Sequence, residues 1–265
     1  MRQPRLLIIE PALVREVLIS NFSSFHDNEF SRMIDAKNDL LLGNNPFLSR
    51  GDVWKEKRAE IAPGFSNNRL KALYPLIQNI QKRLSAYINE EILKGSKDPF
   101  DAREICAKYT TDVVSSCVFA ADGESFTKKD PEIRAMSKKL MKPDGKTIFL
   151  IILTSIFPFM KRFVKVQFVA SETQNFFINL LEQALNYRKT NNVHREDFLD
   201  HLINLKNKKS ITTIDMAAHS ITFFSDGLET SSIALAHTLY EVCFLFVINL
   251  INVINIISYF TAGKK

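Results

Sequence analysis

Cysteine is scarce in this chain of 265 residues, and its three cysteines form no CxxC pair. Cys106 and Cys117 are expected on one helix about 16 Å apart, which is too far for a disulfide. Cys243 has no ligand-loop sequence around it, so it is not a candidate metal ligand. A disulfide framework is therefore excluded, and reduced thiols are the simplest interpretation.

The signatures of several common sites are also missing. There is no GxGxxG after a predicted strand, and no GxxxxGK(S/T), HExxH or GxSxG occurs. No histidine stands at metal-ligand spacing from a cysteine or aspartate; the histidines are His26, His194, His201, His219 and His237. These absences exclude the usual nucleotide-binding, zinc-hydrolase and serine-hydrolase classes, and no metal site is predicted.

Charge of one sign is in only mild excess. The net charge is +6, and the basic residues are not gathered in one stripe, so no nucleic-acid partner is predicted. A mild positive charge suits an anionic membrane surface, which leaves a peripheral membrane contact open. No signal peptide is predicted, because the apolar run Leu6–Ile9 is too short for one.

Apolar residues recur at helical spacing along much of the sequence. This periodicity predicts a mainly α fold with one short strand at Arg5–Ile9. A loop is expected over residues 43–52, where glycine, asparagine and proline gather. The predicted helices begin near Pro11 and Asp130 or cover Trp54–Ile61, Ser66 to about Leu93, Ala102–Phe119, Ser171–Arg188 and a long apolar segment from about Thr213.

Two stretches are unusually apolar. Ile148–Phe159 contains Pro158 and is shorter than the roughly 20 residues of a bilayer span, so a buried or membrane-grazing helix is expected. Val242–Phe260 carries no charge, but three asparagines interrupt it at helical spacing. For this second stretch, a buried helix end, a weak membrane segment and aberrant sequence all remain open.

Two local patterns have the residue types that chemistry needs. Trp54 and Arg58 place an indole N–H and a guanidinium one helical turn apart, a pair of donors that suits a carboxylate. The segment Asp226–Thr230 places a glycine, two acids and a hydroxyl inside the long apolar helix, where they disfavour helix locally. For each pattern alone, an ordinary amphipathic or kinked helix remains an alternative.

In this order, the two patterns resemble a cytochrome P450. The Trp54-x-x-x-Arg58 segment is similar to the family's C-helix, and Asp226–Thr230 is similar to its I-helix oxygen-activation motif. Arg195–Leu199 and Asn21–Asp27 resemble the same regions of microsomal, insect detoxification members. The resemblance covers about residues 5–241, and it implies the family's helical fold.

The resemblance also implies roles for individual residues. Trp54 and Arg58 match positions that hold a haem propionate, and Gly227 matches the place where the I-helix passes close over the haem. Glu229 and Thr230 match the acid–alcohol pair that delivers protons during oxygen activation. The implied cofactor is haem, with a proximal cysteine thiolate that favours O–O cleavage.

The sequence departs from the family at Asp226, where many members have Ala or Gly, and more deeply after Glu241. No ExxR pair follows the I-helix motif, and no FxxGxRxCxG loop occurs. We therefore expect a partial, incomplete cytochrome P450 domain over residues 1–241, a non-family apolar tail over 242–265, and no active haem-thiolate centre in this chain alone. The alternative is a non-catalytic truncated product, either a pseudogene relic or a membrane-associated fragment.

The family resemblance implies partners and a location as well. A complete member would be a monooxygenase that oxidises lipophilic small molecules with O2 and electrons from NADPH–cytochrome P450 reductase. It would lie at the cytosolic face of the endoplasmic reticulum membrane, although no membrane anchor is expected in this chain. Phe47, Phe157 and Phe223 are candidate apolar walls for a substrate, and ordinary core packing is an equal alternative for each.

Overall fold

The computed structural model describes residues 6–262 except 29, 30, 32, 33, 35, 36, 96–100, 143, 158, 161, 162 and 165, and for 247–262 it describes the backbone alone. Helices make up the regular structure of these residues, and no strand occurs among them. The mainly α prediction is therefore confirmed.

The N-terminal strand predicted at Arg5–Ile9 is not seen in the described part of that segment. Leu6–Ile9 has no regular structure, and Leu6 is 87% and Ile9 78% exposed. A strand needs a hydrogen-bonded neighbour, which no other described segment supplies. Arg5 lies outside the described residues.

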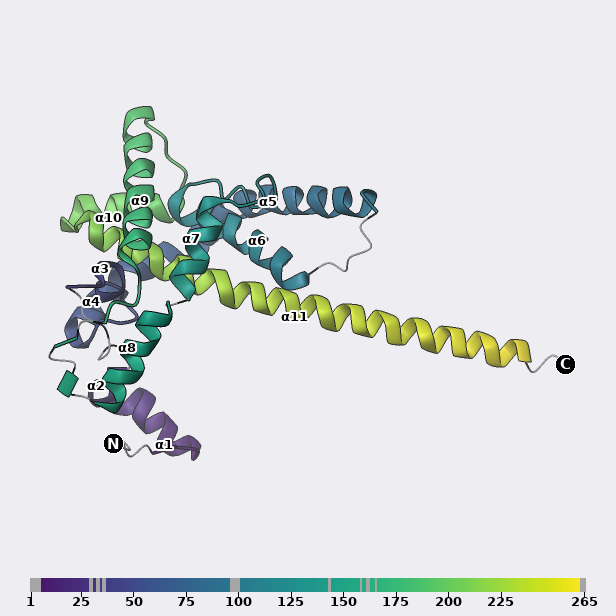
Figure 1. Cartoon of the computed structure of the whole chain (residues 1–265), viewed down its shortest axis with the longest axis horizontal. Helices are drawn as coiled ribbons and strands as arrows, with labels where there is room; N and C mark the ends of the chain where they lie inside the picture. Colours follow the sequence, from purple (N-terminus) through teal and green to yellow (C-terminus); the bar gives the residue numbers. More distant parts are fainter. Residues whose placement is uncertain are drawn as a thin grey trace.

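The helices follow one another along the chain, joined by connections of different length (Figure 1). The first are α1 (Pro11–Arg15), η1 (Glu16–Ser20), α2 (Phe22–Phe25), α3 (Leu40–Gly43), α4 (Gly51–Ile61), η3 (Ala62–Phe65) and α5 (Asn67–Leu93). The remainder are α6 (Ala102–Val114), η4 (Ser115–Phe119), α7 (Glu132–Met141), α8 (Gly145–Ile156), α9 (Ser171–Asn191), α10 (Phe198–Lys209) and α11 (Thr213–Ala262). Each long helix predicted from the sequence is present, whereas the short α3 and the 12-residue α10 have no predicted counterpart.

The predicted start of α11 is confirmed by its hydrogen bonds. The amide of Thr212 donates to Oδ2 of Asp215, and the amide of Asp215 donates back to Oγ1 of Thr212, both at 3.1 Å. This reciprocal pair satisfies donors that a helix start otherwise leaves open. Ser66 occupies the predicted N-cap position of α5, but its side chain makes no capping hydrogen bond.

The core lies where α11 crosses α6, η4 and α9. Three phenylalanines meet there, and each is fully buried: Phe119 from η4, Phe177 from α9 and Phe224 from α11. Their ring centroids are 5.1–5.7 Å apart, within the range of favourable aromatic pairs. This cluster fixes the first half of α11, which carries the candidate site residues.

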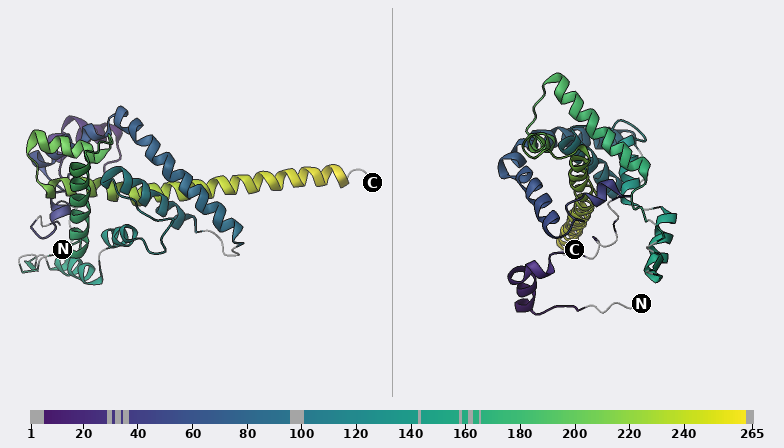
Figure 2. Two further views of the ribbon diagram at one scale, coloured as in Figure 1. Left: turned by 90° about the horizontal axis from the view of Figure 1, so that it is seen from above. Right: turned by 90° about the vertical axis from the view of Figure 1, so that its left-hand side faces the viewer.

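The second half of α11 extends beyond the other helices (Figures 1 and 2). Its described side chains are open to solvent; Leu239 is 47% and Tyr240 64% exposed. The helix continues through the predicted boundary at residue 241 without a break and takes in the apolar stretch Val242–Phe260. Within the described part of the chain, no helix combines the length and apolar character needed to cross a membrane.

The apolar helix predicted around Ile148–Phe159 is α8, which ends at Ile156. Thr154 is its one buried residue, whereas Phe149 is 62% and Ile152 52% exposed. A buried helix was therefore the wrong alternative for this stretch, because most of the side chains of α8 are open to solvent. Pro158 lies outside the described residues.

Candidate functional site

Trp54 and Arg58 lie one turn apart on α4, as predicted. The indole of Trp54 is half-buried and meets the ring of Phe22 in α2 edge-on, with centroids 5.7 Å apart. Arg58 is exposed, and no carboxylate in the described part of the chain pairs with it. The arrangement leaves a guanidinium available to an anionic oxygen group beside a held indole.

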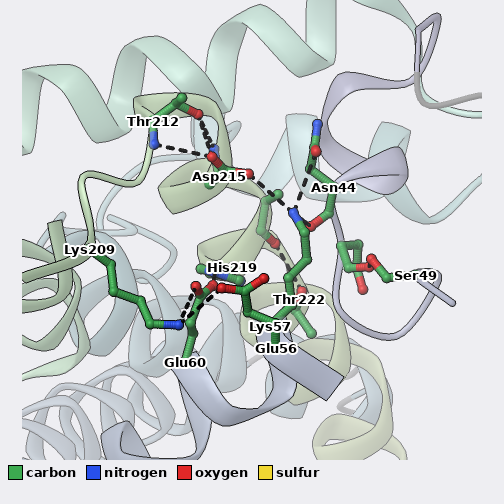
Figure 3. A network of polar contacts seen from close by, with 12 residues as sticks. Asn44, Ser49, Glu56, Lys57, Glu60, Lys209, Thr212, Asp215, His219 and Thr222 are labelled. Atoms are coloured by element: carbon green, nitrogen blue, oxygen red, sulfur yellow. Dashed lines mark hydrogen bonds and ion pairs between the residues drawn. The ribbon is translucent and has the colours of Figure 1, made fainter. Parts of the chain in front are cut away.

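The neighbouring charged residues of α4 are engaged in a polar network (Figure 3). Nζ of Lys57 donates to Oδ1 of Asp215 at 3.1 Å, and Nε2 of His219 lies 3.0 Å from Oε2 of Glu60. Nζ of Lys209 donates to Oε1 of Glu60 at 3.3 Å. Burial opposes ionisation of Asp215, but hydrogen bonds from Thr212 and Lys57 hold its pKa below the usual value.

Sequence reasoning missed this network. Zinc-site spacing tests a histidine only as a metal ligand, and within the described residues no cluster of metal-ligating side chains is found. One signal was available: His219 stands in the apolar run Met216–Phe224, where a buried polar group requires a partner. The sequence could not identify Glu60 as that partner.

Asp226 and Thr230 share the exposed face of α11. The hydroxyl of Thr230 donates to the backbone carbonyl of Asp226, one turn earlier. Partial desolvation raises the pKa of the Asp226 carboxyl, with a weaker opposing effect from the hydroxyl of Ser225. The two side chains therefore place a held hydroxyl and a carboxyl with increased proton affinity on one surface.

Gly227 faces α6. A Cβ atom on Gly227 would lie 3.3 Å from Cγ1 of Val114, tighter than an ordinary contact. The close approach that the structure shows at this glycine is therefore to a neighbouring helix. Its predicted place over a haem is a separate matter and stays a prediction.

Glu229 turns toward the same helix. Its Oε1 accepts a hydrogen bond from Nη2 of Arg103 at 2.6 Å, and the two side chains are 33% and 67% exposed. An exposed pair of this kind exchanges readily with water and contributes about 0–1 kcal/mol to stability. Glu229 and Thr230, predicted to act together, thus have different partners in this structure.

The three phenylalanines predicted as candidate substrate walls are not joined to one another by a ring contact. Phe223 packs against Phe65 and Phe198, with centroids 4.0 and 4.6 Å away, so core packing accounts for it. Phe47 and Phe157 are 60% and 46% exposed. All three cysteines are free; Cys106 and Cys117 are buried and Cys243 is exposed.

In chain order, α4 with Trp54 and Arg58 comes before α11 with Glu229 and Thr230. This order can be compared with known families. The family model described as Cytochrome P450 matches residues 1–243. The chain belongs to the cytochrome P450 family. The family implies haem as the cofactor, so the question is whether the candidate site fits a haem.

Its relatives include cytochromes P450 of insects. The chain is 36% identical over 243 residues to Probable cytochrome P450 28a5 of Drosophila melanogaster, covering 90% of this chain and 48% of that protein. It is 29% identical over 262 residues to Cytochrome P450 6k1 of Blattella germanica, covering 90% of this chain and 49% of that protein. The chain thus spans about half the length of the curated relatives it matches.

The described residues fit one part of a haem site. A haem propionate is a carboxylate, and the indole N–H of Trp54 with the unpaired guanidinium of Arg58 offers the donors that it accepts. Lys57, which lies beside Arg58, is held by Asp215 and Asn44. Arg58, one position further on, differs from Lys57 in having no carboxylate partner in the described part of the chain.

Proposed function

We propose that the chain supplies the propionate-binding helix and the oxygen-side helix of a haem-thiolate monooxygenase. Trp54 and Arg58 of α4 would hold a haem propionate, and Gly227, Glu229 and Thr230 belong to the part of α11 that lines the oxygen side. The observation that carries the proposal is the unpaired Arg58 guanidinium one turn from the held indole. When bound, haem supplies oxidation with O2.

Proton movement is the role that we assign to α11. The Thr230 hydroxyl donates a hydrogen bond to the backbone carbonyl of Asp226, so its oxygen remains free to accept a hydrogen bond. The raised pKa of Asp226 increases the protonated fraction of that carboxyl on the same face. Glu229 would exchange protons with solvent once it is separated from Arg103. Breaking this exposed ion pair costs little free energy.

The remaining family properties are part of the proposal. We assign a lipophilic substrate, electrons from NADPH–cytochrome P450 reductase, and the cytosolic face of the endoplasmic reticulum membrane. The exposed apolar residues of α8 support a peripheral membrane contact, because a row such as Phe149, Ile152 and Ile156 can enter a lipid surface. The domain division at residue 241 also remains a proposal.

Trp54 provides a direct test, since it is the only tryptophan of the chain. Haemin bound beside it should quench its fluorescence saturably. Arg58→Gln should weaken that binding about tenfold or more, because a hydrogen bond to a charged group contributes about 1.5–3 kcal/mol. The control Lys55→Gln removes a charge from the same helix and should bind haemin like the unmodified chain; equal binding by both variants would contradict the proposal.

We further propose that haem bound to this chain lacks a thiolate ligand, since no FxxGxRxCxG loop occurs in the 265 residues. The reduced carbon-monoxide difference spectrum of the haemin-loaded chain should then lack the Soret band characteristic of thiolate-ligated haem. Appearance of that band would show that one of the three cysteines serves as ligand, and replacing each cysteine by serine in turn would identify it.

A further inference from the structure

Polar contacts make up much of the attachment of α4 to the body. The helix buries Glu60 and Ile61, and its other residues, all described, are half-buried or exposed. Lys57 and Glu60, three residues apart, meet Asp215 and His219, four residues apart on α11. Because these spacings each make one helical turn, the two contacts together fix a single register between α4 and α11.

The chemistry of His219 is defined by its surroundings. Its side chain is fully buried, and Nδ1 has no hydrogen-bond partner in the described part of the chain. An ionised Glu60 offers only acceptors, so the proton belongs on Nε2, which donates to Oε2. With a second proton on Nδ1, His219 would carry a charge and a buried N–H without an acceptor. Burial disfavours that charged form and lowers the pKa of His219.

Glu60 joins α4 to a second helix as well. Its backbone carbonyl accepts from Nε2 of His201 at 2.7 Å, and its Oε1 accepts from Nζ of Lys209 at 3.3 Å, both from α10. Glu60 is 8% exposed, so its carboxylate requires such partners. Removing His219 takes away the one partner of this carboxylate that comes from α11.

We propose that His219 is a positioning residue, which through Glu60 fixes α4 on α11 and thereby places Trp54 and Arg58 for the haem propionate. The inference rests on the proposed function for its haem part. Arg58 stands between Lys57 and Glu60 in the sequence, so the two anchored residues determine the backbone position from which its side chain extends. With little apolar burial to hold α4 otherwise, loss of the His219 contact lets the helix shift.

The test uses the whole chain and the fluorescence of Trp54, first without haemin. His219→Leu removes the donor, His219→Gln keeps an N–H donor, and Ser220→Ala is the control. Ser220 is equally buried next to His219, and its hydroxyl has no partner in the described part of the chain. His219→Leu should shift the Trp54 emission to longer wavelength and increase its quenching by acrylamide, with helix content retained by circular dichroism.

Haemin titration then connects the contact to the site. His219→Leu should weaken binding about tenfold, because loss of the Glu60 contact leaves α4 in its binding position only part of the time. His219→Gln should restore both the emission and the affinity, and Ser220→Ala should change neither. Should His219→Leu not fold, Glu60→Ala removes the same contact from the α4 side and should give the same two changes.

The outcomes separate the two proposals. Unchanged Trp54 emission and quenching in a folded His219→Leu chain would overturn the positioning role, as would an equal effect of Ser220→Ala or no recovery with His219→Gln. If His219→Leu alters Trp54 as expected while the unmodified chain binds no haemin, the placement of α4 by His219 stands and the haem proposal fails.

Discussion

Gly123 lies so close to Asp112 that a Cβ atom on the glycine would stand 2.2 Å from Oδ1 of the aspartate. Asp112 is buried in α6, and its Oδ1 accepts the amide of Ser125 at 3.1 Å. Burial raises the pKa of Asp112, with hydrogen bonding from Ser125 opposing that rise. The contact holds the segment after η4 against α6 and leaves no space for a side chain at Gly123.

Gly123→Ala is therefore expected to destabilise the chain by about 1–3 kcal/mol, the usual cost of forcing atoms into a packed site. Gly145 in the first turn of α8 is the matched control, because a Cβ there would meet nothing within 4 Å. Gly145→Ala should be neutral or stabilising by about 0.5–1 kcal/mol. Urea denaturation measures both, and equal midpoints for the two variants would contradict the packing at Gly123.

Arg188 is expected to be among the most sensitive charged residues. Its guanidinium is buried and pairs with both Asp197 and Asp200 at the start of α10. Arg188→Met should destabilise by about 3–5 kcal/mol, since it removes the buried countercharge that both carboxylates share and leaves Asp197 only the longer contact with Arg195. Arg83→Met removes the exposed pair with Asp122 and should cost about 0–1 kcal/mol. A similar loss of the free energy of unfolding in both variants would show that burial does not decide the cost.

Acid should weaken the fold through His219 and His201. Burial is the largest cause of a lowered pKa at both residues. Below about pH 6.5 the unfolded chain binds protons that the folded chain refuses, so the free energy of unfolding should fall as pH drops from about 6.5 toward the folded pKa values. Above that range both histidines are neutral in the folded and the unfolded chain, so they do not make the free energy of unfolding depend on pH.

Urea midpoints between about pH 7.5 and about pH 5.5 measure this dependence. His219→Gln should reduce the slope, because glutamine does not titrate. His194→Gln is the control, since that side chain is 78% exposed. A slope that His194→Gln reduces as much as His219→Gln would assign the acid sensitivity to exposed groups instead.

Binding to anionic lipid vesicles tests the proposed membrane contact of α8. Phe149→Ser combined with Ile152→Ser should reduce partitioning about tenfold or more, because each side chain loses the apolar burial that lipid provides. Leu93→Ser removes an apolar side chain that is 86% exposed at the end of α5 and should leave partitioning unchanged. Equal partitioning of all three chains would exclude α8 as the contact.

Local rules predicted most of the long helices, because caps and apolar periodicity act over a few residues, but they missed α10. The capping pair Thr212 and Asp215 is one confirmed example. The strand at Arg5–Ile9 failed because a strand depends on a neighbour that the segment itself cannot reveal. The Glu60–His219 contact was out of reach for a related reason: the two residues are 159 positions apart, and no local pattern pairs them.

The candidate site was predictable only in part. The one-turn spacing of Trp54 and Arg58 follows from their helix, and the structure bears it out. Glu229 meets Arg103 and Gly227 meets Val114, both on α6. These contacts depend on how α11 packs against α6, which the helical periodicity of the sequence does not determine. The chemical roles of Glu229 and Gly227 remain predictions until haemin binding is measured.

The composition of α11 makes its two halves distinguishable by proteases. No lysine or arginine occurs between Ser210 and Gly263, so trypsin has no cleavage site anywhere along this helix. Chymotrypsin has several, including Phe224 within the core and Tyr240 on the extended half. Cleavage requires local unwinding, which is easiest where side chains pack on nothing. Within α11, brief chymotrypsin digestion should therefore cut near Tyr240 before it cuts at Phe224, and should leave a segment of this helix that resists trypsin and still carries His219, Asp226 and Thr230.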